Sequence, residues 1–405
     1  MKVMGLMSGT SLDGIDAALL EVGAPDLSKE DPGTQRFVSP SWELLAFRTC
    51  PFSQEERSFI HGTLASGGPR EVALLHTRIG EAFAIATMDL LKTAAITPES
   101  VSALGSHGQT LWHEPPKGEI RGTSFQVGCP STLAERTGIG IVSDFRSRDL
   151  AAGGHGAPLV PWADRIFFSS LDHARAIQNL GGMANVTWLP RSGDPKPLLA
   201  FDTGPGVALL DAAMELATDG AKSFDENGEL ARQGEVSSTV LNRLLAHPFF
   251  NLSPPRSTGR ETFGSSMVEE LAGEMRGEGR GLLVPGSPAT GWADLLATLT
   301  AFTARSIGGA YRKWVLPLGV DEVFLVGGGS RNPALFQALE EELSPLRVRS
   351  GDSLGMDVDA REAAAFGLLA WAHLMGIPAN VPEATGSSGP RVLGSWTPGT
   401  REVRP

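Results

Sequence analysis

The stretch "MGLMSGTSLDGIDAALLEV", residues 4–22, predicts how the chain begins to fold. Two short apolar runs flank a turn of Gly, Ser and Thr, which is the pattern of two strands joined by a tight turn. The turn leads directly into Asp13 and Asp16, although a simple chain reversal needs no carboxylates. We therefore expect a β-hairpin whose turn binds a ligand, and an ordinary hairpin is the alternative.

The same pattern returns in "ARAIQNLGGMANVTWLP", residues 174–190, as a strand, a Gly-Gly turn and a second strand. Further strands and helices alternate around both hairpins, and the first long amphipathic helix is predicted over residues 71–94. A mixed α/β chain that repeats its plan predicts two related lobes with a cleft between them. We place one lobe at residues 1–170 together with 372–405, and the other at residues 171–371.

Composition narrows the class of protein. A chain of 405 residues is long enough for two domains with cores of their own. The net charge of -12 argues against nucleic-acid or membrane-surface partners, because both need clustered Lys and Arg. The N-terminus does not resemble a signal peptide, and no apolar run reaches the roughly 18 to 20 residues that span a bilayer. Since Cys50 and Cys129 are the only cysteines, we expect a cytoplasmic protein, with a homodimer as one option for its assembly.

Three glycine-containing turns have the composition of ligand sites. In "SGTSLDG", residues 8–14, backbone N–H groups could hold phosphate oxygens, although the Gly-Lys-Ser/Thr ending of a Walker A loop is missing. In "FLVGGGSRN", residues 324–332, three glycines after a strand would allow a ribose or a flat ring to approach the main chain. In "FDTGPG", residues 201–206, Asp202 ends a strand and could act as a general base, with a helix cap as the alternative.

Two further loops carry polar side chains between small residues. "GSHGQT", residues 105–110, contains His107 and Gln109, and "SDFRSRD", residues 143–149, contains Arg146. Such side chains suit hydroxyl, amide and carboxylate groups. Glu362 stands in the first turn of a predicted apolar helix, where the helix dipole alone would favour it. The histidines show no metal-binding spacing.

Together with "GLMSGTSLDGID", "VSDFRSRDLAAGGHGAPLVP", "NLGGMANVT" and "RSTGRETF", these motifs resemble the anhydro-N-acetylmuramic acid kinase family over nearly the whole chain. The resemblance implies the two-lobed, ribonuclease H-like fold of sugar kinases, actin and heat-shock chaperone ATPases, with the active site in the cleft between lobes. Family members use ATP, Mg²⁺ and water to open the 1,6-anhydro bridge of the sugar and to phosphorylate O6. The product is N-acetylmuramic acid 6-phosphate, an intermediate of peptidoglycan recycling.

The resemblance also implies a role for each matching position. Asp202 would activate the attacking water. The ATP phosphates would be bound by Gly9, Thr10, Ser11, Leu12, Asp13, Gly14, Ile15 and Asp16, with Asp13 reaching the metal. The adenosine and a second phosphate contact would lie at Gly181, Gly182, Gly327, Gly328 and Gly329. The sugar would contact His107, Gln109, Arg146 and Glu362.

The chain departs from the family pattern at Val207, His155, Arg256 and Arg361, where Asn, Gln, Lys and Met are common. These departures bear on substrate preference rather than on the proposed base. Two other functions stay open at this point. One is a kinase for another hexose or amino sugar that does not open a ring, and the other is a nucleotide-dependent binding protein like actin or a chaperone ATPase.

Overall fold

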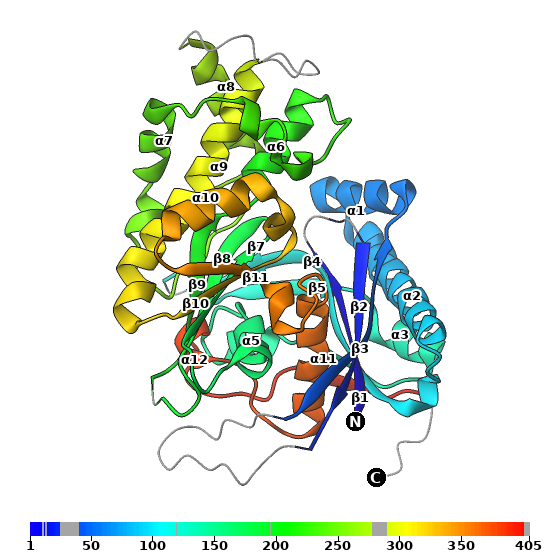
Figure 1. The fold of residues 1–405 in the computed structure, drawn as a ribbon. Coiled ribbons are helices and arrows are strands. Elements are labelled where there is room, and N and C mark those ends of the chain that lie inside the picture. The colour runs from blue at the N-terminus through cyan, green and yellow to red at the C-terminus, as the bar shows by residue number, and fades with distance from the viewer. Residues whose placement is uncertain are drawn as a thin grey trace. The chain divides into compact units, whose positions relative to one another are not determined.

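The computed structural model describes residues 1–9, 12, 14–24, 40–118, 120–194, 196–277 and 290–400 (Figure 1). The chain has the predicted mixed α/β class and divides into two compact units. Unit 1 comprises Met1–Phe167 and Asp359–Pro405, and unit 2 comprises Phe168–Val358. The first predicted boundary, at residue 170, lies close to this division. The second, at residue 371, does not, because it falls inside helix α11 (Arg361–Leu374), which belongs to unit 1.

Unit 1 is built on a mixed sheet with the strand order β12-β6-β4-β1-β2-β3, and β5 pairs with β4. Its strands are β1 (Lys2–Ser8), β2 (Gly14–Val22), β3 (Trp42–Pro51), β4 (Val101–Glu114), β5 (Thr123–Val127), β6 (Ile141–Ser143) and β12 (Ser395–Thr397). The predicted hairpin is confirmed, because β1 and β2 pair in antiparallel fashion from Lys2↔Glu21 to Met7↔Asp16.

The helices of unit 1 are α1 (Gln54–Ser66), α2 (Pro69–Thr93), α3 (Pro130–Thr137), α4 (Ser147–Ala151), α5 (Val160–Phe168, ending at the unit boundary), α11 and α12 (Pro382–Thr385). Helix α11 packs on the sheet at two positions that only glycine allows. A Cβ on Gly5 would overlap the carbonyl oxygen of Ala363, and one on Gly105 would overlap that of Phe366. This close approach explains why α11 belongs to unit 1 although its sequence lies far from β1 and β4.

Unit 2 is built on a sheet with the strand order β11-β10-β7-β8-β9. Its strands are β7 (Arg175–Leu180), β8 (Met183–Leu189), β9 (Leu199–Pro205), β10 (Glu322–Val326) and β11 (Arg347–Ser350). Its helices are α6 (Ala208–Ala217), α7 (Ser238–Leu245), α8 (Ser265–Gly277), α9 (Thr290–Ala310), which continues as a π-turn (Tyr311–Val315), and α10 (Pro333–Leu343). One core lies under the sheet and includes Trp188 and Tyr311, and a second lies among α6 to α9 and includes Phe263 and Trp292.

The repeated plan predicted from the two hairpins is confirmed by the topology of the sheets. In unit 1, β1 pairs antiparallel with β2 and parallel with β4, and β2 pairs antiparallel with β3. In unit 2, β7 pairs antiparallel with β8 and parallel with β10, and β8 pairs antiparallel with β9. Both sheets are extended by one more parallel strand, β6 on β4 and β11 on β10.

Within the described residues, no helix combines the length and the apolar character that crossing a membrane requires. Cys50 and Cys129 are both free thiols.

Candidate functional site

Leu12, in the turn between β1 and β2, has a strained backbone that is anchored by packing. Leu12 adopts a left-handed conformation, with a φ of 59°, and its N–H donates to the Gly9 carbonyl oxygen at 3.3 Å. Its side chain is buried in the core of unit 1, so packing holds the residue in a conformation that costs about 1–3 kcal/mol. Such strain is concentrated at functional sites. Thr10, Ser11 and Asp13 lie outside the described residues.

The base of this turn is tied to β4 by Gln109. The Ser8 hydroxyl donates to Gln109 Oε1 at 2.6 Å and also lies 3.1 Å from the Gly14 carbonyl oxygen. Both Ser8 and Gln109 are buried. The Gln109 side chain therefore braces the turn through Ser8. On the other strand of the hairpin, Asp16 Oδ1 accepts a hydrogen bond from the Thr49 hydroxyl at 2.6 Å.

His107 and Arg146 form a buried polar pair in unit 1. His107 Nδ1 lies 2.9 Å from the Gly108 carbonyl oxygen, so Nδ1 carries the proton and Nε2 accepts from Arg146 Nη2 at 2.8 Å. Burial, followed by the charge of Arg146, holds the pKa of His107 well below its ordinary value. His107 is therefore neutral and holds the guanidinium in place.

Arg146 keeps binding capacity after these contacts. Its Nη1 donates to the Gly156 carbonyl oxygen at 2.8 Å, while its buried Nε has no hydrogen-bond partner among the described residues. Burial lowers the pKa of Arg146 to about 10, against the opposing effect of Glu362. A charged and incompletely bonded guanidinium, with a glutamate nearby, is suited to binding an anionic or hydroxyl-rich ligand.

The start of α11 is fixed by a buried ion pair. Arg361 Nε donates to Asp164 Oδ1 at 2.7 Å and Nη2 donates to Oδ2, so that the two side chains form a bidentate contact between α11 and α5. Both groups are nearly inaccessible to solvent. Glu362, in the first turn of α11 as predicted, follows directly after this anchor.

Asp149 holds the glycine-rich loop that follows α4. Its carboxylate accepts hydrogen bonds from the Gly156 N–H at 2.9 Å, from Asn380 Nδ2 at 2.8 Å and from the Thr385 hydroxyl at 2.8 Å. With three donors and no exposed surface, this acid is structural. Through Gly156 it also supports the carbonyl group that binds Arg146.

In unit 2, Asp202 lies within β9 and not at its end, where the sequence predicted it, because pairing with β8 continues to Pro205. Few hydrogen-bond donors surround its carboxylate. Oδ2 accepts from the Thr258 N–H at 2.8 Å. Burial raises the pKa of Asp202 to about 7, although the Thr258 N–H and Arg256 lower it, and Glu261 raises it further. The residue keeps part of its surface exposed despite this packing. A carboxylate with a pKa near neutrality is suited to accept a proton from water.

The backbone of Asp202 is fixed by Arg256, a role that the motif "RSTGRETF" did not reveal. Arg256 Nε donates to the Asp202 carbonyl oxygen at 2.9 Å, and the Asp202 N–H donates to the Arg256 carbonyl oxygen at 3.1 Å. The Arg256 guanidinium also stacks on Phe201 and Phe249. Near the same carboxylate, the Thr258 hydroxyl oxygen is buried with no hydrogen-bond partner among the described residues, so it is available to a ligand.

The three glycines of the turn after β10, Gly327, Gly328 and Gly329, are not equally required by the fold. Gly327 has a φ of 80°, and a Cβ there would overlap Asn179 Oδ1. At Gly329 a Cβ would lie 2.7 Å from both the Leu180 carbonyl oxygen and Val207 Cγ1. Only Gly328 faces open space, with nothing within 4 Å of the Cβ position. Of the three glycines, Gly328 is therefore the one a ligand can approach.

The Gly181–Gly182 turn between β7 and β8 is bonded to the segment that follows β9. The Gly181 carbonyl oxygen accepts from the Val207 N–H at 2.9 Å, and that of Gly182 accepts from the Gly206 N–H at 2.9 Å and the Ala208 N–H at 3.1 Å. These bonds place the turn beside the chain segment that continues from Asp202.

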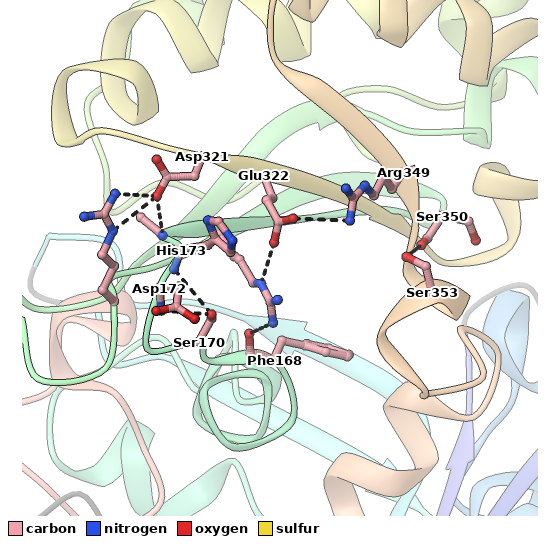
Figure 2. A network of polar contacts seen from close by, with 12 residues as sticks. Phe168, Ser170, Asp172, His173, Asp321, Glu322, Arg349, Ser350 and Ser353 are labelled. Carbon is pink, nitrogen blue, oxygen red and sulfur yellow. Dashed lines mark hydrogen bonds and ion pairs between the residues drawn. The ribbon is translucent and has the colours of Figure 1, made fainter.

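A second group of charges lies where the parallel strands β7, β10 and β11 begin (Figure 2). The first residues of these strands form one edge of the unit 2 sheet, and the glycine turns that follow β7 and β10 lie at the opposite edge. Glu322 accepts from Arg175 Nε at 3.0 Å and lies 3.2 Å from Arg349 Nη1. Asp321 accepts from the Ala174 N–H at 2.7 Å and from Arg191 Nη2 at 2.9 Å. These carboxylates are fully used by protein groups, which is the mark of a structural network.

The structure thus groups the predicted residues within each unit. Unit 1 holds the β1–β2 turn and the Gln109, His107–Arg146 and Glu362 side chains, and unit 2 holds Asp202 and both glycine turns. Arg256, Thr258, Asp149 and the Arg361–Asp164 pair support these residues and were not predicted to do so. In the described part of the chain, no three His, Cys, Asp or Glu side chains gather as metal ligands.

Comparison with known proteins identifies the relatives of this chain. The family model described as "Anhydro-N-acetylmuramic acid kinase" matches residues 1–399. A protein of that name from Caldanaerobacter subterraneus subsp. tengcongensis is 40% identical over 399 residues, covering 97% of this chain and 96% of the relative. A protein of the same name from Gloeobacter violaceus is 41% identical over 399 residues, covering 98% of each. A solved structure of a ROK family glucokinase from Streptomyces griseus in complex with glucose and AMPPNP aligns at 11% identity with a TM-score of 0.36, covering 89% of this chain and 98% of that chain.

Proposed function

The chain belongs to the anhydro-N-acetylmuramic acid kinase family, and on that premise we propose that it uses ATP and water to open 1,6-anhydro-N-acetylmuramic acid and to phosphorylate O6. The product is N-acetylmuramic acid 6-phosphate, an intermediate of peptidoglycan recycling. The observation that carries this proposal is the Asp202 carboxylate, which is held by one N–H group and has a pKa of about 7. The proposed location is the cytoplasm, where the two free thiols would stay reduced.

Asp202 is the proposed general base. It accepts a proton from a water molecule whose oxygen attacks the anomeric carbon, and the bond between that carbon and O6 breaks. O6 leaves the anomeric carbon with the electron pair of that bond and attacks the γ-phosphorus of ATP, so that ADP is released. A base with a pKa near 7 is ionised in part at neutral pH and still binds a proton strongly enough to assist the attack. Arg256 and Thr258 keep its carboxylate and backbone in one position.

The β1–β2 turn is the proposed phosphate site. Its N–H groups would face phosphate oxygens without adding net charge. Among the described residues of this segment, Leu12 is held by packing and Ser8 by its hydrogen bond to Gln109. Carboxylate oxygens suit Mg²⁺, and Asp13 is the proposed ligand, directly or through water. When bound, Mg²⁺ neutralises phosphate charge.

Recognition of the sugar is assigned to Arg146, His107 and Glu362. The lactyl carboxylate of the substrate is an anion, and Arg146 has a buried Nε with no partner among the described residues. Neutral His107 orients that guanidinium through Nε2. Glu362 is placed by the Arg361–Asp164 ion pair directly before it, and its carboxylate can accept hydrogen bonds from sugar hydroxyl or amide groups.

Substrate-dependent ATP turnover tests the proposal. The full chain is assayed for ADP release with no sugar, with anhydro-N-acetylmuramic acid, and with N-acetylmuramic acid, which lacks the bridge. We expect strong stimulation by the anhydro sugar only. Equal stimulation by both sugars would indicate a kinase that does not open a ring, and no stimulation by either would favour a nucleotide-dependent binding protein.

A further inference from the structure

Unit 2 contains a basic cavity that the proposed reaction does not use. It has a volume of about 230 Å³ and is lined by Leu245, Phe250, Arg256, Arg305, Ser306, Gly309, Ala310, Arg312 and Lys313. Four of these side chains are cationic and none is acidic. In a chain with a net charge of -12, such a concentration of positive charge is a local feature and not a reflection of composition.

The cations of this cavity differ in how far the protein already uses them. Arg312 Nη1 is paired with Glu342 at 2.7 Å, and Lys313 Nζ donates to the Phe250 carbonyl oxygen at 3.0 Å. Arg305 makes no hydrogen bond or ion pair within the described residues, and Arg256 uses Nε and Nη1 but not Nη2. The cavity therefore presents unused N–H donors beside an apolar wall, which suits a small phosphate-bearing anion.

The wall of the cavity is continuous with the strand that carries Asp202. Arg256 spans the two, because it lines the cavity while its Nε binds the Asp202 carbonyl oxygen. Phe250 and Ser306 lie directly against β9, since a Cβ added to Gly204 would come within 3.0 Å of the Phe250 ring and 3.1 Å of Ser306 Oγ. A ligand in the cavity would thus contact the groups that fix the proposed base.

We propose that this cavity is a second anion site, separate from the β1–β2 turn, which binds a small phosphate-bearing anion and is coupled to Asp202 through Arg256. A bound phosphate would offset the positive charge of Arg256. The charged groups that act on Asp202 are Arg256, which lowers its pKa, and Glu261, which raises it. Offsetting Arg256 therefore raises the pKa of Asp202, and the ligand is inhibitory at neutral pH.

Calorimetric titration of the full chain tests the binding site. The probes are inorganic phosphate and glycerol 3-phosphate, in a buffer free of phosphate and with a non-hydrolysable ATP analogue at saturation to occupy the β1–β2 turn. We expect Arg305→Gln to weaken binding about tenfold or more, because a charge-assisted hydrogen bond is lost. The matched control is Arg347→Gln, an exposed arginine of β11 in the same unit, which should bind like the unchanged chain.

The two probes separate the sources of the ligand. Tighter binding of glycerol 3-phosphate indicates a phosphate ester that uses the apolar wall, and equal binding indicates free phosphate; both results support the site. No binding by the unchanged chain, or equal binding by the unchanged chain and Arg305→Gln, overturns it. Coupling is measured from the pH dependence of kcat. With the probe at saturation, we expect the pH at which kcat reaches half of its plateau to rise by about a few tenths of a unit. An unshifted limb overturns the link to Asp202.

Discussion

The two edges of the sheet in unit 2 use acidic residues in opposite ways. Where β7, β10 and β11 begin, Glu322 contacts two arginines and Asp321 contacts Arg191 and the Ala174 N–H (Figure 2). Toward the other edge, the Asp202 carboxylate receives one backbone N–H and no side-chain donor among the described residues. The glycine turns that follow β7 and β10 lie at this second edge.

The pKa values of two aspartates express this difference. Hydrogen bonds from the Ala174 N–H and Arg191 lower the pKa of Asp321, whereas burial raises that of Asp202 to about 7. A carboxylate surrounded by donors is stabilised in its ionised form and has little tendency to accept a proton. A buried carboxylate with few donors is less stable as an anion and is therefore the better base. The acids that stabilise the fold and the acid proposed as the base therefore lie toward opposite edges of this sheet.

The largest expected effect comes from replacing one acid at each edge. Asp202→Asn should lower kcat for the anhydro sugar by about 10²–10⁴-fold, because the general base is lost while the shape of the side chain is kept. The matched control, Glu322→Gln, should keep kcat within about twofold, because it acts on stability alone. Steady-state ADP release measures both, and nucleotide titration checks that ATP still binds. Near-normal turnover in Asp202→Asn would move the base to another residue.

The pH profile gives the next largest effect. Asp202 must be ionised to accept a proton, and its pKa is about 7, so activity rises with pH up to that value and levels off above it. At pH 5 we expect kcat to be about 100-fold below its plateau. The profile is measured between pH 5 and 9 for the unchanged chain and for Glu322→Gln, which should keep the same limb. A flat profile would show that ionisation of Asp202 does not limit the reaction.

Stability should change in opposite directions at the two edges. The folded pKa of Asp202 exceeds the ordinary value of 3.8, so the folded state binds the proton more tightly and loses stability as pH rises through about 7. Asp202→Asn should therefore raise the free energy of unfolding at pH 8 by on the order of 1 kcal/mol and leave it nearly unchanged at pH 4. Glu322→Gln should lower it by about 2 kcal/mol, because Arg175 and Arg349 lose their partner.

Urea unfolding at both pH values measures these differences. Destabilisation by both substitutions at pH 8 would mean that the ionised Asp202 is structural as well, and the contrast between the edges would fail.

The parts of this arrangement that depend on local pattern could be predicted from the sequence. The two hairpins, the repeated plan and a strand that contains Asp202 follow from short apolar runs interrupted by glycine, although that strand runs on to Pro205 and does not end at Asp202. The long-range contacts could not be predicted. Helix α11 joins unit 1 because Gly5 and Gly105 leave room for it, and the sequence does not state which helix a glycine in a strand will meet.

The supporting residues of the site were missed for the same reason. The hydrogen bond between Ser8 and Gln109 joins residues about one hundred positions apart. Arg256 and Asp202 are 54 residues apart and are linked by two reciprocal hydrogen bonds. Hydrogen bonds between distant segments leave no periodic signal, so only the folded structure reveals them.

The smallest expected effect separates the glycines that the fold requires from the one that a ligand would contact. Gly327→Ala should destabilise the chain by about 1–2 kcal/mol, because φ is 80° and Asn179 occupies the Cβ position. Gly328→Ala should change stability by less than about 0.5 kcal/mol, since its Cβ position is open. If adenosine lies against Gly328, the added methyl group should raise the KM for ATP severalfold while kcat stays the same. An unchanged KM would place the adenosine away from Gly328 and leave this triplet with a structural role in packing against β7.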